Sequence, residues 1–510
     1  MNGSMKKKFR VVFRDSFLSR AQVEIVKAKA LEYDREIEFE LIPVQTSGDM
    51  GSEKGTDLFT KDLQNILKKG EADIAIHSLK DVSSPAFFNE TQYAIADRDD
   101  IRDIAIFNPD ILTKLREGKQ IIIGTSSPRR SGMAIPFLKR ALPYSGKKNI
   151  DISTLPIRGN IDQRLGKLQS KEFDGVILAV AGLNRLLEHG PAGIIKTLIK
   201  DKKWMILPLF ECPPAPGQGA IVIEALKDNG DADSLLKAID SKKLKQSLGE
   251  ERVLSSQYGS GCMGAYGLFH MDLPNTSFTF AAGKNEAGED FTDWKMDINI
   301  EIEEHKLFSS TDHMKSFFRS EPDPDMIIPD SSEAFFVSSH KAIHSDIIKK
   351  KLNEKRVWAA GTHTWYELAK MGIWVEGCAD GLGLESITAL LSSPLVGLPK
   401  TDIRIITNKS STTHWKEDGW NSTGTYELIP ALPADLKEKI IGAEMIFWTS
   451  FQQYELCKDL LKKNVIHACP AGKTATLLKS RDLLPVIFPT IKAFSFWREK
   501  NRHNVAGINN

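Results

Sequence analysis

The sequence predicts a multidomain α/β protein, and three observations indicate this. The chain has 510 residues, enough for roughly three to five domains with separate cores. In its first part, strand patterns alternate with helical patterns, which is typical of open sheets with parallel strands. The segment Ser320–Asp330 is acidic and rich in proline, so we interpret residues 321–330 as a linker to a second part.

The individual elements follow from the spacing of apolar residues. We predict strands at 10–14, 37–44, 73–77, 121–124 and 175–180, and helices at 17–31, 58–68 and 161–169. A third segment, 244–320, begins with a helix at about 247–256 and continues with strands at 277–281 and 294–302. We expect this third segment to form a small α+β domain.

The C-terminal part, residues 331–500, contains a weak internal repeat. The run 334–339 is followed by 358–364, and the run 445–450 is followed at nearly the same spacing by 469–474. Each half reads as a strand ending in hydroxyl side chains, a helix, a second strand and a turn of small residues. The repeat predicts two α/β lobes that face one cleft.

Composition and charge exclude several classes of protein. Apolar residues make up 41% of the chain and charged residues 26%, and the net charge of +1 argues against a general nucleic-acid binder. The five cysteines are widely spaced without a CxxC pair, which argues against a disulfide framework or a zinc site. We find no secretory signal and no apolar run of about 18 residues. We therefore expect a cytoplasmic protein without metal, bound neither to membranes nor to nucleic acid.

Polar side chains cluster where the predicted strands end, which is where open α/β sheets bind ligands. Lys80 and Asp81 come just after the buried strand at 73–77. Such a pair is more often a solvated turn, but the apolar strand before it favours a site with perturbed charges.

Arginines mark the other strand ends. The run Gly124–Arg130 leaves a strand and enters a helix, so that backbone amides, hydroxyls and guanidiniums converge into an anion site. The arginines at strand ends are Arg14, Arg129, Arg130, Arg158 and Arg164. An ion pair with a surface acid would explain any single one of these arginines, but it poorly explains all five. The five arginines together therefore predict a ligand with several carboxylates or phosphates.

Cys262 lies in a glycine-rich loop after the predicted helix at 247–256. Glycine neighbours leave a sulfur accessible, as a derivatised thiol requires. A small buried side chain is the commoner role of a lone cysteine.

Together these motifs resemble porphobilinogen deaminase (hydroxymethylbilane synthase) over residues 9–320. The matching runs, in family order, are 77–82, 124–130, 158–165, 174–185, 214–220 and 261–266. The resemblance implies two periplasmic-binding-protein-like α/β lobes and a third domain. The implied ranges are 9–98 with 204–228, 99–203, and 244–320.

The resemblance also implies the chemistry and the residues that perform it. A dipyrromethane cofactor is attached to Cys262, and Asp81 handles the protons as ammonia leaves each porphobilinogen on the way to hydroxymethylbilane. The implied cofactor-binding residues are Cys262, Lys80, Asp81, Ser127, Arg129, Arg130 and Arg158. The implied substrate-binding residues are Arg14, Ser16, Gln22, Lys61, Arg158 and Arg164. Only Met263 separates Cys262 from Gly264, where the family has a longer loop.

Residues 331–500 resemble uroporphyrinogen-III synthase less specifically, through the repeat and the run Thr425–Glu427. That family closes hydroxymethylbilane with inversion of its last ring, without a cofactor. The resemblance implies a bilobal α/β module in which Tyr426 assists loss of the substrate's hydroxyl. Propionates would bind at Ser339, Thr364, Ser450 and Thr474. Helix caps and a packed tyrosine are the alternative, and we expect the family's opening strand and helix to be missing.

The leading interpretation is a bifunctional tetrapyrrole enzyme, expected to be a monomer with porphobilinogen and hydroxymethylbilane as ligands. Hydroxymethylbilane closes spontaneously to the wrong isomer, so a tethered second site would shorten its free lifetime. One alternative is a deaminase with a non-catalytic C-terminal module. The other is a non-enzymatic solute-binding protein, against which the Cys262 loop argues.

Overall fold

The computed structural model describes residues 8–46, 60–82, 88–144, 149–258, 264–274 and 276–508, and Cys262 lies outside them. The chain divides into two compact units. The first comprises Met1–Lys139, Lys148–His270 and Thr279–Asp293, and the second comprises Arg140–Lys147, Met271–Phe278 and Trp294–Asn510. No helix among these described residues is long and apolar enough to cross a membrane.

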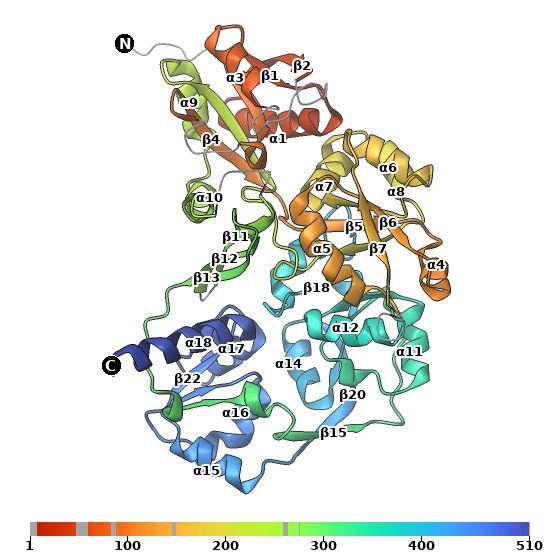
Figure 1. Ribbon diagram of the computed structural model, residues 1–510, viewed down its shortest axis with the longest axis vertical. Helices are drawn as coiled ribbons and strands as arrows, with labels where there is room; N and C mark the ends of the chain where they lie inside the picture. Colours follow the sequence, from red (N-terminus) through yellow and green to blue (C-terminus); the bar gives the residue numbers. More distant parts are fainter. Residues whose placement is uncertain are drawn as a thin grey trace. The chain divides into compact units, whose positions relative to one another are not determined.

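The first sheet of the first unit has the strand order β2-β1-β3-β10-β4, of which Figure 1 labels β1, β2 and β4. Its strands are β1 (Lys8–Arg14), β2 (Glu38–Val44), β3 (Ile74–Ser78), β4 (Thr91–Arg98) and β10 (Ala220–Leu226). β1 is parallel to β2 and β3, whereas β10 is antiparallel to β3 and β4. The three strands predicted here are confirmed to within about two residues.

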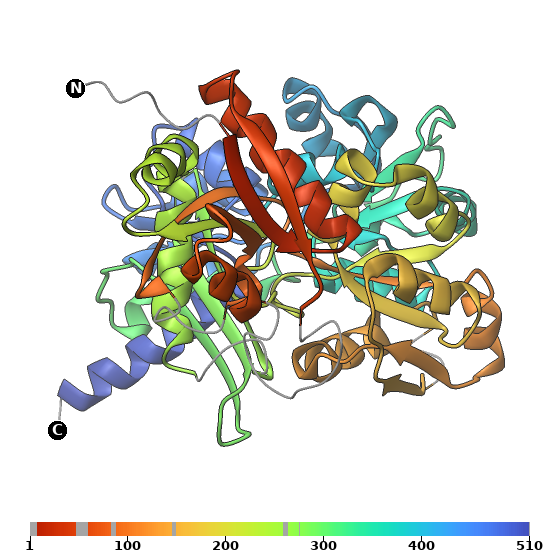
Figure 2. The same ribbon diagram turned by 90° about the horizontal axis from the view of Figure 1, so that it is seen from above.

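Helices cover both faces of this sheet, and the alternation of side chains along β1 shows which helix lies on which face. The helices are α1 (Phe17–Tyr33), α3 (Lys61–Lys68) and α9 (Gly230–Ile239). Val11 packs with Val23 of α1, whereas the next residue, Val12, packs with Leu63 of α3. Figure 2 shows α1 running alongside the strands of this sheet.

The second sheet of this unit has the order β7-β6-β8-β5-β9. Its strands are β5 (Asp103–Phe107), β6 (Ile121–Gly124), β7 (Ile152–Leu155), β8 (Gly175–Ala179) and β9 (Lys203–Ile206), and its helices are α4 (Ile111–Glu117), α5 (Pro128–Ala141), α6 (Ile161–Gln169), α7 (Val180–His189) and α8 (Ala192–Ile199). β6 is parallel to β7 and β8, and β5 is antiparallel to β8 and β9. The chain enters from β4 and returns to β10, so two segments connect the two sheets.

A helix and a three-stranded sheet follow, with the order β11-β12-β13. The elements are α10 (Lys242–Ser255), β11 (Tyr266–Leu273), β12 (Thr276–Lys284) and β13 (Asp290–Met296). The predicted strand at 294–302 is wrong, because residues 297–303 form no regular structure. Ile298 and Ile300 pack against the core cluster that contains Leu307 and Phe447, so their alternation reflects burial of one side of an extended segment without a hydrogen-bonded partner strand.

The second unit contains two more sheets. The six-stranded sheet has the order β15-β20-β19-β16-β17-β18 and is parallel except for β15 against β20. Its strands are β15 (Phe318–Pro322), β16 (Ala334–Val337), β17 (Arg356–Ala359), β18 (Gly377–Cys378), β19 (Ile403–Asn408) and β20 (Asn421–Pro430). Its helices include α11 (Asp346–Asn353), α12 (Thr362–Lys370), α13 (Thr388–Leu391) and α14 (Thr412–Glu417).

The four-stranded sheet has the order β14-β21-β22-β23 and is parallel throughout. Its strands are β14 (Leu307–Ser309), β21 (Met445–Phe447), β22 (Ile466–Pro470) and β23 (Val486–Phe488). The helices are α15 (Ala434–Gly442), α16 (Phe451–Cys457), α17 (Lys473–Lys479) and α18 (Ile491–Ile508). The two halves of the sequence repeat therefore lie in different sheets, one in each.

The C-terminal sheets begin earlier in the chain than the sequence indicates. β14 pairs with β21 and β15 pairs with β20, although residues 244–320 were expected to belong to the third domain and 321–330 to a linker. An opening strand is therefore present, followed by the 3-10 turn Ser310–His313. β15 lies at the edge of its sheet, where charged side chains and a terminal proline are tolerated, and this gives it the composition of a linker.

Candidate active site

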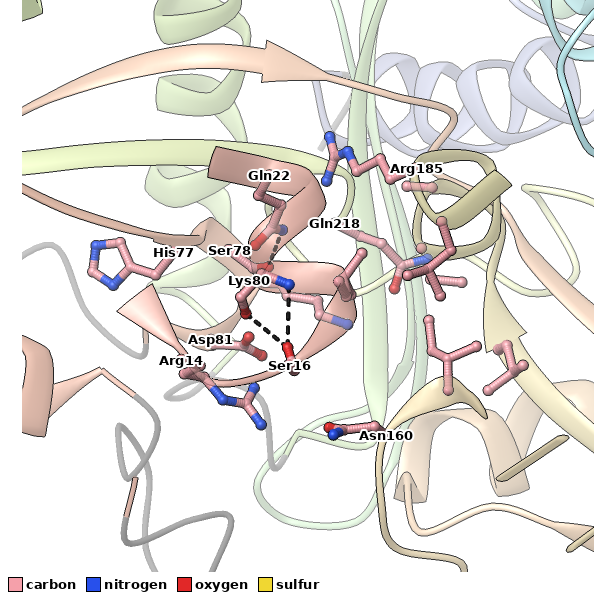
Figure 3. A pocket seen from close by; sticks show the side chains of 18 of the residues that line it. Arg14, Ser16, Gln22, His77, Ser78, Lys80, Asp81, Asn160, Arg185 and Gln218 are labelled. Atoms are coloured by element: carbon pink, nitrogen blue, oxygen red, sulfur yellow. Dashed lines mark hydrogen bonds between the residues drawn. The ribbon is translucent and has the colours of Figure 1, made fainter. Parts of the chain in front are cut away.

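A cavity of about 220 Å³ lies in the first unit, at the carboxyl ends of strands from both five-stranded sheets (Figure 3). The first sheet contributes Arg14 and Ser16 after β1 and residues 78–81 at the end of β3. The second contributes Arg130 in α5, which follows β6, and residues 159–164 after β7. Sequence reasoning placed a ligand site at these strand ends, and the cavity lies at the same place.

Ser16 and Gln22 connect the elements on the first-sheet side of the cavity. Ser16 caps α1, accepting a hydrogen bond at Oγ from the backbone N of Ser19 at 3.1 Å. Gln22 is buried and donates from Nε2 to Oγ of Ser78 at 2.9 Å. Because Ser78 ends β3, this bond links α1 to the segment that carries Lys80 and Asp81.

Lys80 and Asp81 line the cavity from the 3-10 turn Leu79–Asp81 that follows β3. Both are half-buried, and Figure 3 shows the carboxylate of Asp81 near Arg14 and Ser16. Gly217 packs against this turn and has a backbone φ of +73°. A Cβ atom at this position would lie 2.9 Å from Cγ of Leu79. The glycine therefore allows the 213–219 loop to pack on Leu79 and so fixes the turn that presents Asp81.

His77 projects away from Asp81 (Figure 3), and its ring belongs to a buried polar cluster. Its Nε2 lies 3.2 Å from Oε2 of the fully buried Glu224. The other carboxylate oxygen of Glu224 accepts hydrogen bonds from Nε2 of Gln64 at 2.7 Å and from Oγ1 of Thr91. This cluster joins β3, β4, β10 and α3, and it supports the strand that ends at the cavity.

Arg129 and Arg130 both bind Asp103 at the start of β5. Arg129 donates from Nη2 at 2.8 Å, and Arg130 donates from Nη2 at 2.7 Å and from Nε at 3.1 Å. Gln218 donates a further bond to Asp103 at 3.0 Å. Burial alone would raise the pKa of the Asp103 carboxyl, but the two guanidiniums outweigh it and hold that pKa well below its usual range.

Three guanidiniums crowd one side of the cavity. Burial, together with the positive charges of Arg130 and Arg14, lowers the pKa of Arg164 to about 10. Arg164 donates from Nε to the carbonyl oxygen of Gly159 at 2.7 Å, which holds it in place at the first turns of α6. Like charges held together in this way favour an anionic ligand, because such a ligand relieves their repulsion.

Arg185 and Asn184 of α7 form hydrogen bonds with the two segments that connect the second sheet to the first. Arg185 is buried and donates from Nη2 to the carbonyl oxygen of Gly219 at 2.5 Å and to Asp97 at 3.2 Å. Asn184 donates to Asp99 at 2.9 Å. Burial lowers the pKa of Arg185 and raises that of Asp99.

Sequence reasoning missed the roles of several of these residues. Arg185 and Gln218 lie inside runs that were noted, but nothing in their spacing distinguishes them. Asp103 lies in the charged run 97–103, which has the composition of a surface loop. The remaining polar residues that line the cavity without having been predicted are Ser19, Thr60, His77, Ser78, Asn160 and Asp162.

Some predicted residues do not line the cavity. Arg129 is buried and directs Nη1 to the carbonyl oxygen of Pro213 at 2.6 Å, and Oγ of Ser127 accepts a hydrogen bond from the backbone N of Arg130. Arg158 and Lys61 are exposed to solvent. Their proposed contacts with cofactor or substrate, and the role of Cys262, stay predictions.

In the second unit, Tyr426 lies among polar groups at the carboxyl end of the six-stranded sheet. It is buried, and its hydroxyl is hydrogen-bonded with Ser339 after β16 and Asn408 at the end of β19. Burial raises the pKa of Tyr426, and the two hydrogen bonds act against that rise. The structure thus brings together Tyr426 and Ser339, both selected from sequence, and adds Asn408.

The other three hydroxyls selected in this part have separate settings. Ser450 caps α16 in a reciprocal arrangement with Gln453, which is the helix-cap alternative. Thr364 is buried in α12, and Thr474 is half-buried at the start of α17. Their proposed contacts with propionates stay predictions.

Metal binding and reactive thiols find no support in the described part of the chain. It contains no group of three or more histidine, cysteine or acidic side chains placed to hold a metal ion. Burial raises the pKa of Cys457 to about 11 and that of Cys469 to about 12, which makes both thiols poor nucleophiles.

Comparison with known proteins agrees with this geometry. Residues 9–234 match the family model of the porphobilinogen deaminase, dipyromethane cofactor binding domain. The chain is 34% identical over 283 residues to the porphobilinogen deaminase of Caldicellulosiruptor saccharolyticus, which covers 54% of this chain and 89% of that protein. It is 32% identical over 288 residues to a probable porphobilinogen deaminase of Pyrobaculum islandicum, and this match covers 55% of this chain and 88% of that protein.

Among solved structures, the chain is similar to the probable amino-acid ABC transporter extracellular-binding protein YtmK of Bacillus subtilis. The TM-score is 0.28 and the identity 11%, and the match covers 49% of this chain and 97% of that one. A score this low carries no argument about the fold. The matches to deaminases do support a family assignment, because they span nearly the whole length of those relatives. The chain therefore belongs to the porphobilinogen deaminase family.

Proposed function

We propose that this chain joins four porphobilinogen molecules into hydroxymethylbilane, with Asp81 as the catalytic carboxylate. The observation that carries this proposal is the cavity in which Asp81 shares the wall with Arg14, Arg130 and Arg164. A pyrrole of this pathway bears an acetate and a propionate, so a growing oligomer brings many carboxylates. Guanidiniums are well suited to bind them in pairs of hydrogen bonds.

The residues of the cavity fit the dipyrromethane cofactor that the family uses. Its four carboxylates would meet a site in which burial, together with the charges of Arg130 and Arg14, lowers the pKa of Arg164 to about 10. Among the residues that the family resemblance implies for the cofactor, Lys80 and Arg130 are the cations that line the cavity. When bound, the cofactor supplies the pyrrole carbon onto which the first substrate is added.

The side chain of Asp81 performs two tasks in this scheme. Its carboxylate stabilises positive charge on the substrate pyrrole as ammonia departs, and it accepts the proton that the pyrrole carbon releases after coupling. Both effects are strong in a partly buried site, where the dielectric constant is lower than in water. The hydrogen bond from Gln22 to Ser78 and the packing of Gly217 on Leu79 hold this carboxylate in place.

Arg164 is expected to contribute to substrate binding. We expect Arg164→Gln to raise the KM for porphobilinogen by about tenfold or more, since a hydrogen bond to a charged group contributes about 1.5–3 kcal/mol. Steady-state kinetics would measure this, with the exposed Arg35→Gln as the matched control. Arg158→Gln, tested alongside, decides whether the exposed Arg158 belongs to the substrate path. An unchanged KM in Arg164→Gln would remove Arg164 from it.

Cys262 is proposed as the covalent anchor of the cofactor. We expect intact-protein mass spectrometry to show the added mass of two pyrroles on the wild type and its absence from Cys262→Ala. Cys212→Ala is the matched control, because Cys212 is buried. Wild-type protein that carries no added mass, after expression in a host that makes the cofactor, would contradict this assignment and would favour a solute-binding role. A colour reaction with an acidic aldehyde reagent gives the same information.

We further propose that the C-terminal part cyclises hydroxymethylbilane to uroporphyrinogen III. Two observations support it. The part has two sheets, one parallel throughout and one parallel except for β15, and it has its own opening strand β14, as a complete bilobal module requires. The hydroxyl of Tyr426 meets Ser339 and Asn408 at the carboxyl end of the larger sheet, where it is able to donate a proton to a departing hydroxyl.

Incubation with porphobilinogen followed by isomer analysis tests both activities. We expect oxidised product of type III from the full chain, and type I from a Tyr426→Phe variant. Tyr454→Phe is the matched control, because Tyr454 lies on α16, in the other lobe. Type I alone from the wild type would leave a deaminase with a non-catalytic C-terminal module.

A further inference from the structure

The six-stranded sheet of the second unit has a topological switch point. From β16 the chain proceeds to β17 and β18 on one side, and β19 and β20 lie on the other. In such sheets the loops after the two central strands separate and leave room for a ligand. Here those loops begin at Ser338 after β16 and at Lys409 after β19, and the hydroxyl of Tyr426 meets Ser339 and Asn408 beside them.

Two imidazoles stand next to this cluster. His340 follows Ser339 in the 3-10 turn His340–Ala342, and His363 lies in the first turn of α12, after β17. Their rings meet edge to face, with centroids 5.1 Å apart and planes at 85°. Nδ1 of His340 is buried and has no hydrogen-bond partner within the described residues. A polar nitrogen buried in this way indicates a missing partner.

The surroundings of His340 favour its neutral form while no ligand is bound. Burial lowers the pKa of His340, and the neighbouring His363 lowers it further. The charged groups around it are Lys341 on its own turn and Glu367 and Lys370 on α12. Glu367 accepts a hydrogen bond from Lys370 at 2.6 Å, so its charge is largely balanced. On β19 and β20 the nearby polar groups are Asn408 and Tyr426, and Glu427 is paired with Lys409 at 2.7 Å.

We propose that His340 and His363 form a carboxylate-binding site in which His340 takes up a proton when the ligand binds. The identity of the ligand, a carboxylate of the linear or cyclic tetrapyrrole, rests on the proposed cyclisation. The site itself rests on the geometry of the two rings. An imidazolium and the amide of Asn408, which has two N–H groups, offer hydrogen-bond donors to a carboxylate, and the balanced Glu367 opposes it little.

Proton uptake gives the site a definite dependence on pH. A carboxylate beside His340 raises the pKa of the imidazole in the complex above its value in the free protein. Affinity for the ligand is therefore highest at acidic pH and falls as the pH rises through the pKa of the complex. Between the two pKa values, binding one ligand molecule takes up about one proton.

Isothermal titration with uroporphyrin III measures this uptake directly. The observed enthalpy of binding at pH 7, plotted against the ionisation enthalpy of several buffers, gives the number of protons taken up. For the full-length wild type we expect about one proton. His340→Gln should lose this uptake and bind about tenfold more weakly, which corresponds to about 1.4 kcal/mol. His305→Gln, an exposed histidine in the same unit, should match the wild type.

His363→Gln keeps the turn of His340 intact and serves as the second variant. Because it removes the neighbour that lowers the pKa of His340, we expect its free protein to be more protonated and its uptake to be smaller than in the wild type. Equal uptake in the wild type and in His340→Gln, or no uptake in the wild type, overturns the proposal.

The isomer assay separates this proposal from the proposed function. Type III product together with proton uptake that does not depend on His340 would contradict the histidine site and would still support cyclisation. Type I product together with uptake that depends on His340 establishes the site and removes the catalytic role of the module.

Discussion

The Asp81→Asn variant is expected to fold like the wild type and to lose nearly all turnover of porphobilinogen. Asparagine has the size of aspartate but neither its charge nor its capacity to accept a proton. We expect kcat to fall by about 10²- to 10³-fold or more, the range for loss of one preorganised electrostatic group in an active site. Thermal unfolding should be nearly unchanged, since Asp81 is half-buried and sits in a turn on the cavity wall.

A matched control comes from the same cavity. Asp162 also lines it, so Asp162→Asn changes the charge of the cavity by the same amount without touching the proposed catalytic carboxylate. We expect a far smaller fall in kcat for Asp162→Asn. Equal losses in the two variants would mean that the total charge of the cavity matters and that the position of Asp81 does not. Wild-type turnover in Asp81→Asn would remove Asp81 from the mechanism.

Several of the cavity residues that sequence reasoning identified lie at or just after the end of an apolar strand, whereas Gln22 and Arg164 lie within the helices that follow. Arg14, Ser16, Lys80 and Asp81 follow β1 and β3, and the pattern of the strand marks their position. Residues that act by pairing with a side chain distant in the sequence are not marked by any local sequence pattern. Asp103 binds Arg129 and Arg130, and Glu224 approaches His77, only because the sheets bring these segments together.

Elements with strongly apolar cores were predictable, and elements at the edges were not. β1, β3, β6 and β8 are buried, and their apolar runs predicted them. β15 pairs along the edge of its sheet and consists largely of exposed side chains, so its composition matched that of a linker. β14 is three residues long, too short for its alternation to stand out from its surroundings. Because β14 and β15 were not predicted from the sequence, the C-terminal module was expected to lack its opening strand.

Buried charge supports the arginine side of the active site, and Asp103 is its centre. The Asp103 carboxylate is fully buried and receives hydrogen bonds from Arg129, Arg130 and Gln218. Replacing it by asparagine leaves two guanidiniums without their shared counter-charge. Removing one partner of a buried ion pair costs about 3–5 kcal/mol, so we expect Asp103→Asn to lower the free energy of unfolding by that amount.

Urea denaturation of the full chain at pH 7 measures this loss, and a surface pair provides the control. Asp233 pairs with Lys237 one helical turn away on α9, where the lysine is largely exposed, and Asp233→Asn should cost about 0.5 kcal/mol or less. A loss in Asp103→Asn no larger than that of the control would show that the arginines find other partners.

The effect of Asp103 should also depend on pH in a defined direction. Its pKa in the folded protein lies below the usual 3.8, so its contribution to stability is fully present above that value. As the pH falls below about 4, the unfolded chain takes up a proton that the folded one does not, and the contribution declines. The difference in stability between wild type and Asp103→Asn should therefore be constant from pH 7 to 5 and shrink in acid. A difference that grows in acid would mean that Asp103 is protonated in the fold, and that the two arginines are held by other groups.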